Sequence, residues 1–197
     1  MSYRLEKKII INKNKVTNTL GWIKENKFTE IFKERLITSI YYDNLNFDLY
    51  KDSEEGVVPR KKIRIRSYDN KNDKILEKKI TSQEGRFKIS HDVKTKDNFY
   101  AKIYDNFYGY CYPVSKIVYI RRYFNNDKTR ITIDQNIQYF KISNLKITNF
   151  NYKEPDCVME FKSDVSEENN LENLSNYQFA RFSKYCKSIT ALKINQL

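Results

Sequence analysis

The chain has 197 residues, of which 37 are Lys or Arg and 25 are Asp or Glu, so its formal net charge is +12. Hydrophobic residues make up 40% and aromatic residues 15%, which excludes a disordered chain and allows a sizeable core. The mean hydropathy is −0.78. Without a long apolar run or a signal-peptide pattern, we expect a single domain over residues 1–197 with no membrane segment.

The positive net charge favours an anionic partner: nucleic acid, an anionic membrane, or a phosphate-rich small molecule or polymer. Cys111, Cys157 and Cys186 are odd in number and lack paired spacing, so they predict neither a zinc site nor a disulfide framework. Free cysteines are typical of a reducing compartment, and we expect a cytoplasmic location. His91, the only histidine, lies beside Asp92 in a predicted loop and cannot form a histidine metal cluster alone.

The first part of the chain predicts a strand, a helix and a second strand. Charged and apolar residues alternate over 4–11, which is typical of a strand. An imperfect apolar stripe predicts that 13–35 is mostly helical, and β-branched and aromatic residues predict a strand over 36–43. Residues 43–52 suit a short turn or helix, and 53–59 form a predicted loop.

The next stretch, 60–68, predicts a strand with a cationic face. With the two-residue period of a strand, one side carries Arg60, Lys62, Arg64 and Arg66. Such neighbours repel one another unless solvent, carboxylates or a bound anion screen them. A solvated edge strand explains this pattern equally well. Polar residues 69–73 predict a hairpin to a strand at 74–81, and Arg86 and Lys88 share one side of a short third strand.

The second half predicts mainly strands and a terminal helix. Residues 95–108 suit either a helix or a long connection. The further strand candidates are 114–124, 130–134, 138–150 and 157–164. The turn residues Asn125, Asn126 and Asp127 predict a hairpin between the first two. After a polar break, residues 171–189 show roughly helical spacing.

The roughly eight strand candidates mostly keep apolar residues on one face and charges on the other. An ordinary sheet with one solvated face explains this. Two features favour another interpretation. Arginine, which binds phosphate through several donors, recurs on the charged faces, and single carboxylates recur among them. These carboxylates are Glu6, Glu77, Asp134 and Glu160. A closed antiparallel barrel could turn this face inward to hold a phosphate chain and a divalent metal.

A series of short motifs follows in a fixed order along the chain. They are RLEKK at 4–8, SIYYD at 39–43, RKKIRIRSY at 60–68, LEKK at 76–79, YIR at 119–121, RITID at 130–134, MEFK at 159–162 and RFSKY at 181–185. In this order the set resembles the polyphosphate polymerase domain of the vacuolar transporter chaperone (VTC) family. That family is part of the triphosphate tunnel metalloenzyme, or CYTH-like, superfamily.

The resemblance implies an α+β fold in which a closed, eight-stranded antiparallel barrel forms a triphosphate tunnel flanked by helices. Its eukaryotic members transfer the terminal phosphate of ATP to a growing inorganic polyphosphate chain with a divalent metal, Mn2+ or Mg2+. Carried onto this sequence, the phosphate-coordinating, catalytic cations would be Arg64, Arg66, Lys79, Arg121, Arg130 and Lys184. Further substrate-binding residues would be Lys8, Arg60, Lys62, Arg86, Lys88, Lys162, Tyr41 and Tyr68. Glu160 would hold the metal, with Glu6 in support.

The sequence also departs from the family pattern. The wider superfamily usually opens with two glutamates and a lysine at alternate positions, and Arg4 replaces the first glutamate here. Metal binding then depends mainly on Glu160, unless this carboxylate instead forms an internal salt bridge with Lys162 or with a tunnel arginine. We expect Asp43 and Asp134 to orient arginines. The phosphate-sensing domain and membrane segments of the eukaryotic complexes have no counterpart in these residues.

Four functions remain open at this point. The first is a polyphosphate polymerase, whose partners are ATP or another triphosphate and inorganic polyphosphate. The second is a triphosphatase, and the third is a non-catalytic polyphosphate-binding module. Nucleic-acid binding is the fourth. We do not expect it, because the cations are spread over alternate positions of many strands rather than gathered on one helix or patch.

Overall fold

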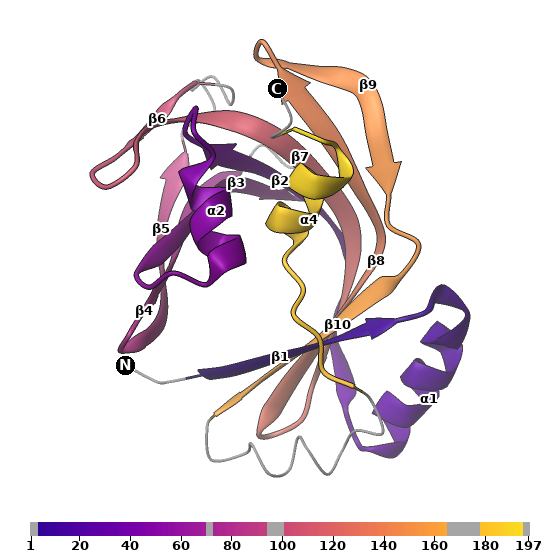
Figure 1. Ribbon diagram of the computed structural model, residues 1–197. Helices are drawn as coiled ribbons and strands as arrows, with labels where there is room; N and C mark the ends of the chain where they lie inside the picture. Colours follow the sequence, from indigo (N-terminus) through magenta and orange to yellow (C-terminus); the bar gives the residue numbers. More distant parts are fainter. Residues whose placement is uncertain (1–3, 70–72, 94–100, 165–177, 195–197) are drawn as a thin grey trace. The chain divides into compact units, whose positions relative to one another are not determined.

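The computed structural model describes residues 4–69, 73–93, 101–164 and 178–194 (Figure 1). Its strands are β1 (Arg4–Ile11), β2 (Thr29–Asp43), β3 (Arg60–Tyr68), β4 (Lys74–Ser82), β5 (Gly85–Val93), β6 (Ile103–Asp105), β7 (Gly109–Asn125), β8 (Thr129–Ser143), β9 (Lys146–Lys153) and β10 (Cys157–Asp164). The helices are the 3-10 turn η1 (Lys13–Lys15), α1 (Val16–Glu25), α2 (Asp48–Glu55) and α4 (Lys184–Ala191). The fold is therefore α+β, with a mostly antiparallel sheet and few helices.

Hydrogen bonds join the strands in the order β1-β10-β8-β7-β2-β3-β4-β5, with β6 beside β7 and β9 beside β8. This 10-stranded sheet is an open path with β1 and β5 at its ends, and the described residues show no pairing between these two strands. The strand pairing therefore does not confirm the closed, eight-stranded barrel expected from the sequence.

The chain forms two compact units, which we describe separately. Unit 1 contains residues 1–35, 119–137 and 154–182, and unit 2 contains residues 36–118, 138–153 and 183–197. The long strands β2, β7 and β8 each contribute residues to both units. The assignment of 1–197 to one domain stays a prediction.

Unit 1 is built on antiparallel pairing of β1 with β10 and of β10 with β8. Alternate residues of these strands point to one apolar face, and α1 covers it with Val16 and Ile23. Trp22 of the same helix contacts the rings of Phe28 and Phe161, each at 6.3 Å between centroids. The other buried residues of this core are Ile9, Ile11, Phe124, Ile131, Ile133, Cys157 and Met159.

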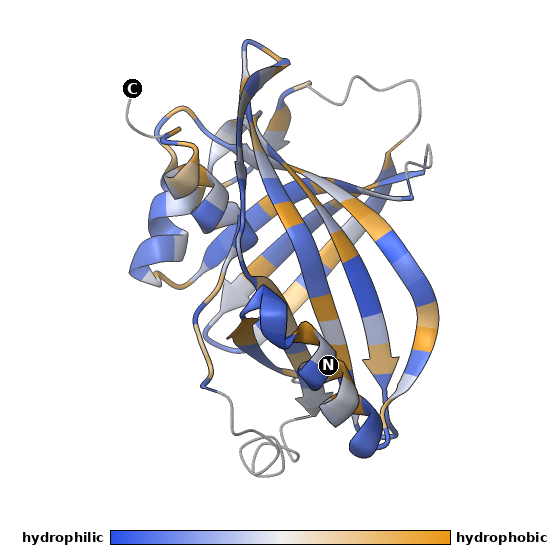
Figure 2. Cartoon of the chain, turned by 90° about the vertical axis from the view of Figure 1, so that its right-hand side faces the viewer, coloured by the Kyte–Doolittle hydropathy of each residue, from blue (hydrophilic) through white to orange (hydrophobic). Residues whose placement is uncertain are grey.

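Unit 2 is built on antiparallel pairing of β2, β3, β4 and β5 in that order. Figure 2 shows hydrophobic and hydrophilic residues alternating along the long strands of the sheet. The apolar face of β3 buries Ile63 and Ile65 in a cluster that includes Tyr42, Tyr108 and Leu49 of α2. Helix α2 packs against both β3 and α4, and the two helices lie side by side in Figure 1. The opposite face of the same strands carries Arg64, Arg66 and Glu77.

Much of the predicted strand pattern is confirmed. The strands over 4–11, 60–68, 74–81 and 157–164 are present, and Asn126 forms the β7–β8 turn by accepting from the backbone of Lys128 and Thr129. The strand at Arg86 and Lys88 is longer than expected, and α2 extends to Glu55 in the predicted loop. His91 is exposed, but it lies within β5 and not in the loop expected from the sequence.

The prediction of a mostly helical segment over 13–35 is wrong in its second half. Helix α1 ends at Glu25, where the side chain of Asn26 donates to the carbonyl of Trp22 and Lys27 adopts a positive φ of 60°. The chain then continues as β2 from Thr29. The apolar residues that suggested one stripe belong to two elements, with Ile23 on the helix and Ile31 and Phe32 on the strand.

The terminal helix predicted over 171–189 is also shorter than expected. Residues up to 177 lie outside the described ranges. Residues 178–183 are extended rather than helical, and Phe179 bridges Ile9 of β1. Helix α4 begins only at Lys184, because the hydroxyl of Ser183 accepts from the amide of Cys186 and caps it.

Two further segments differ from the prediction. The strand expected over 138–150 is divided by a hairpin turn at Asn144 and Leu145. Their φ values of 49° and 60° suit a two-residue loop that joins two antiparallel strands. In 95–108, residues up to 100 lie outside the description, and 103–105 form a short strand paired with β7 instead of a helix. Strand β7 begins at Gly109, five residues before the strand expected over 114–124.

No helix in the described ranges is long and apolar enough to cross a bilayer. The three cysteines are free and buried. The cytoplasmic location stays a prediction.

Candidate functional site

The charged face of unit 2 is made by four neighbouring strands. The register places Tyr41 of β2 opposite Arg64 of β3, and Arg64 opposite Glu77 of β4. One step along the strands, it places Ser39 opposite Arg66. A further row joins Lys62, Lys79 and Lys88 across β3, β4 and β5. Side chains in one row lie next to each other on the same face of the sheet.

The carboxylate of Glu77 lies at the centre of this face. Nε and Nη2 of Arg64 each lie 2.6 Å from Oε2 of Glu77, and Nη1 of Arg66 lies 3.8 Å from the same oxygen. Nζ of Lys88 donates to Oε1 of Glu77 at 3.0 Å. The exposed fractions are 3% for Glu77, 9% for Arg64 and 7% for Arg66. Three cations therefore share one buried carboxylate.

This arrangement changes the pKa values of two groups. Burial alone would raise the pKa of Glu77, but the positive charges of Arg64, Arg66 and Lys88 outweigh it and lower the pKa to about 2. Burial likewise opposes ionisation of Tyr41, whose hydroxyl accepts from Nη1 of Arg64 at 2.8 Å. The same two arginines nevertheless lower the pKa of Tyr41 to about 8. Both shifts indicate a strongly positive potential, which attracts anions.

The start of α4 lies against this charged face. Nζ of Lys62 donates to the hydroxyl of Ser183 at 2.9 Å, and the ring of Tyr185 stacks on Tyr41 with centroids 5.2 Å apart. The charge of Lys184 contributes to the lowered pKa of Tyr41, so this residue lies near the cluster. The Ser-Lys-Tyr motif thus caps a helix and adds one cation and one ring to the site.

Asp43 anchors the surrounding elements and does not orient an arginine, contrary to our expectation. Its carboxylate accepts from the backbone amides of Leu49 and Tyr50 in α2, each at 3.0 Å, and from the hydroxyl of Tyr185 in α4. Burial raises the pKa of Asp43 to about 6, although these hydrogen bonds partly offset the rise. The carboxylate ties β2, α2 and α4 together beneath Tyr41.

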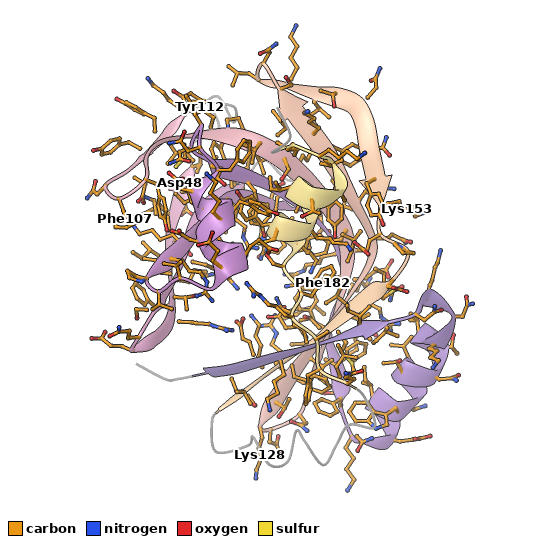
Figure 3. The ribbon with its side chains drawn as sticks, in the orientation of Figure 1. Asp48, Phe107, Tyr112, Lys128, Lys153 and Phe182 are labelled. Carbon is orange, nitrogen blue, oxygen red and sulfur yellow. The ribbon has the colours of Figure 1, made fainter. Side chains whose placement is uncertain are left out.

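The lysines on the opposite face of β3 and β4 have a different partner. Nζ of Lys61 and Nζ of Lys78 each lie 2.8 Å from the carboxylate of Asp105, which is 1% exposed. Asp105 also accepts from the amide of Phe107, which Figure 3 labels in the turn after β6. The cations on the two faces of β3 and β4 therefore have different carboxylate partners, Asp105 on one face and Glu77 on the other.

Unit 1 carries a second set of predicted residues. Nε and Nη2 of Arg121 donate to the two carboxylate oxygens of Asp134 at 2.5 and 2.7 Å, so Asp134 orients this arginine as expected. The guanidinium lies 5.3 Å from the centre of the Tyr119 ring. Burial opposes the charge of Arg121, but Asp134 above all, and also Glu160, raises the pKa of Arg121.

Glu160 and Glu6 lie close to one another on β10 and β1. Nζ of Lys162 is 3.2 Å from Oε1 of Glu160 and 3.1 Å from Oε1 of Glu6. The register places Lys8 opposite Glu160 and Glu6 opposite Lys162. Nζ of Lys8 donates to the carbonyl of Phe182 at 2.7 Å, in the segment that runs beside β1 (Figure 3).

These two carboxylates fit a divalent metal that is shared with a ligand. In the described part of the chain, no three His, Cys, Asp or Glu side chains converge. Glu6 and Glu160 each place an oxygen about 3 Å from one common point, the position of the Lys162 nitrogen. Mg2+ and similar ions are commonly held by one or two carboxylates together with water and substrate phosphate. The donor set therefore suits a hard cation that arrives with phosphate.

Four other predicted residues lie at the margins of these two clusters, and the register places Arg130 opposite Lys162. Nη1 of Arg60 donates to the carbonyls of Gly56 and Val57, at 3.1 and 2.8 Å, in the loop after α2. Arg86 is exposed on β5, and Arg130 is exposed on β8, where its guanidinium lies 5.2 Å from the Tyr123 ring. Tyr68 is half-buried, with its ring 6.0 Å from the Arg66 guanidinium.

The sequence did not reveal the central position of Glu77, nor the parts of Ser39, Ser183 and Tyr185. Glu77 alternates with Lys79 on a predicted strand, and this alternation placed it on the charged face. Its contacts with two arginines required the register between β3 and β4, which the sequence does not specify.

The comparison with protein-family models finds a match to the VTC domain over residues 3–108 and 97–193. The chain belongs to the VTC domain family. The resemblance inferred from the ordered motifs is thus confirmed. A search of curated protein sequences finds no significant match.

Several solved structures share the fold of this VTC domain. A candidate adenylate cyclase from Bacillus halodurans aligns with a TM-score of 0.62 at 14% identity, over 96% of this chain and 97% of that chain. A protein from Pyrococcus horikoshii aligns with a TM-score of 0.55 at 17% identity, over 96% and 99%. A candidate adenylyl cyclase from Hippeastrum, which has a dominant triphosphatase activity, aligns with a TM-score of 0.53 at 13% identity, over 95% and 96%. At these identities the similarity concerns the fold.

Proposed function

We propose that this VTC domain is a metal-dependent polyphosphate polymerase that transfers the terminal phosphate of ATP to a growing inorganic polyphosphate chain. Membership of the VTC family supports an activity on triphosphates or polyphosphate. The observation that carries the proposal is the buried cluster in which Arg64, Arg66 and Lys88 share the carboxylate of Glu77. Guanidinium groups bind phosphate through several parallel donors, and burial strengthens these contacts.

The cluster suits phosphoryl transfer because this reaction requires mainly positioning and neutralisation of charge. Arg64 and Arg66 would bind the oxygens of the phosphate chain, and Lys62, Lys79 and Lys88 form the next row of cations on the same face. The attacking terminal phosphate is already an anion at neutral pH. No general base is then required, which agrees with the exposed position of the only histidine.

The proposal also includes the residues of unit 1. Arg121 would bind phosphate oxygens in the orientation that Asp134 fixes, with Lys8 and Arg130 in support. Glu160 and Glu6 would hold Mn2+ or Mg2+, and such an ion would neutralise charge that develops on the phosphate oxygens during transfer. The triphosphate tunnel inferred from the sequence, with cations of both units on one phosphate chain, stays a prediction.

A triphosphatase is the second candidate. The same cations could bind a triphosphate with water as the nucleophile, and the Hippeastrum protein of similar fold has such an activity. A polyphosphate-binding module without turnover is the third candidate.

Phosphorus NMR of the protein with ATP and Mn2+ separates these candidates. A polymerase yields ADP and the signals of phosphates inside a chain. Release of orthophosphate alone would refute the polymerase and support the triphosphatase, and binding without turnover under Mn2+ or Mg2+ would support the binding module. Arg64→Lys retains the charge but loses the paired donors, and each charge-assisted hydrogen bond contributes about 1.5–3 kcal/mol. We therefore expect its kcat/KM to fall about 10- to 100-fold, whereas Arg122→Lys, which changes an arginine paired with Glu30, retains activity.

A further inference from the structure

The charges on β1 and β10 alternate across the two strands. Glu6 lies opposite Lys162, and Lys8 lies opposite Glu160. Nζ of Lys162 reaches both carboxylates, at 3.1 Å from Glu6 and 3.2 Å from Glu160. The ammonium group therefore lies between the two carboxylates that suit a divalent cation.

The three side chains differ in their freedom to move. The exposed fraction of the side chain is 8% for Glu160, 20% for Glu6 and 26% for Lys162. Glu160 is held within the unit and lies near Arg121, whose pKa it helps to raise. Lysine has a flexible four-carbon stem and a compact charge, so Lys162 can exchange one anionic partner for another more easily than Glu160 can leave its position.

We propose that Lys162 is an internal counter-cation that makes metal binding at Glu6 and Glu160 depend on phosphate. In the free protein its ammonium group satisfies the two carboxylates. A divalent ion requires the same oxygens, and two cations cannot share them at contact distance without strong repulsion. An arriving phosphate chain offers Lys162 another anion, so its ammonium group no longer competes with the metal for the carboxylate oxygens. This inference rests on the proposed use of a phosphate substrate together with a metal.

The coupling has a consequence in the absence of phosphate. Because the Lys162 ammonium group competes for the same oxygens, the free protein binds the metal weakly. By reciprocity, bound metal should strengthen phosphate binding by the same factor. Removing the ammonium group while keeping the length of the side chain removes the cation that both carboxylates share. The metal site is then ready without phosphate.

The test is a titration of the protein with Mn2+ alone, followed by the electron paramagnetic resonance signal of the free ion. We expect Lys162→Met to bind Mn2+ at least about tenfold more tightly than the wild type, within the range usual for coupled sites. Lys162→Gln should show the same gain, whereas Lys162→Arg should bind as weakly as the wild type. The matched control is Lys128→Met, which changes an exposed lysine of the β7–β8 turn (Figure 3).

Adding Glu160→Gln to Lys162→Met tests whether the gain in Mn2+ affinity depends on Glu160. If the inference is correct, the double variant loses it. Unchanged Mn2+ affinity in both neutral variants, the same gain in Lys162→Arg, or a gain that persists without Glu160 would each overturn the inference. Circular dichroism and urea midpoints identify any variant that does not fold, and the conclusion then comes from the remaining variants. The titration contains no nucleotide, so a failure of the proposed polymerase activity does not affect its result.

Discussion

Glu77 allows the clearest test of how the charged face of unit 2 is held together. Glu77→Gln keeps the size of the side chain but removes the negative charge that Arg64, Arg66 and Lys88 share. The two arginines are buried, so they would lose the partner that balances the cost of their desolvation. Breaking a buried ion pair from one side typically costs about 3–5 kcal/mol. We expect the free energy of unfolding at pH 7 to fall by about this amount.

The lowered pKa of Glu77 gives a second figure for the stability that this carboxylate contributes. Lowering it from 4.5 to about 2 corresponds to about 3 kcal/mol of stability. Because the folded state has the lower pKa, this contribution is fully present above about pH 4.5. It is lost as the pH falls through about 2. The difference between the wild type and Glu77→Gln should therefore shrink over this window.

Urea denaturation at pH 7, and in steps from pH 5 to the lowest pH at which both proteins fold, measures this difference. Glu84→Gln is the matched control, because Glu84 is exposed in the turn between β4 and β5. Inorganic triphosphate should also stabilise Glu77→Gln more than the wild type, since its charge can replace the missing carboxylate. A variant within about 0.5 kcal/mol of the wild type at pH 7 would refute the reasoning, because that is the usual range of surface substitutions.

Three further predictions follow from the other contacts. Asp134→Asn leaves the buried guanidinium of Arg121 without its carboxylate. The free energy of unfolding of this variant, measured in urea, should fall by about 3–5 kcal/mol. The control variant Asp127→Asn, in an exposed turn, should change little. The phenol of Tyr41 should titrate near pH 8. The change in ultraviolet absorbance that marks this titration should be absent in Tyr41→Phe. Titration only near pH 10 would contradict the predicted influence of the arginines. Ser183→Ala removes the cap of α4 and should lower stability by about 1 kcal/mol in urea, a loss that Ser183→Thr should largely prevent.

The sequence predicted those features that depend on alternation along a single strand. The cationic side of β3 was inferred from the two-residue period, and Arg64 and Arg66 lie on it in the structure. The pairing of Asp134 with an arginine also follows from alternation, because both residues lie on the charged sides of hairpin arms. The order of the motifs was enough to identify the family.

Features that depend on contacts between distant elements could not be predicted in this way. The stripe that suggested one helix from 13 to 35 is divided at Asn26 and Lys27, where a side-chain hydrogen bond and a positive φ end α1. Asp43 was expected to orient an arginine, but its partners come from α2 and α4, which lie up to 142 residues away in sequence. Burial of Glu77 likewise results from register, and periodicity carries no information about register.

The burial of the arginines on β3 limits which polyanions can reach them. Arg64 and Arg66 expose less than a tenth of their surface, while Lys61 and Lys78 on the other side share the carboxylate of Asp105. A wide, rigid duplex would be kept from such buried arginines by the side chains around them, whereas a slender string of phosphates would need less room to reach them. Selectivity among polyanions would then follow from width rather than from total charge.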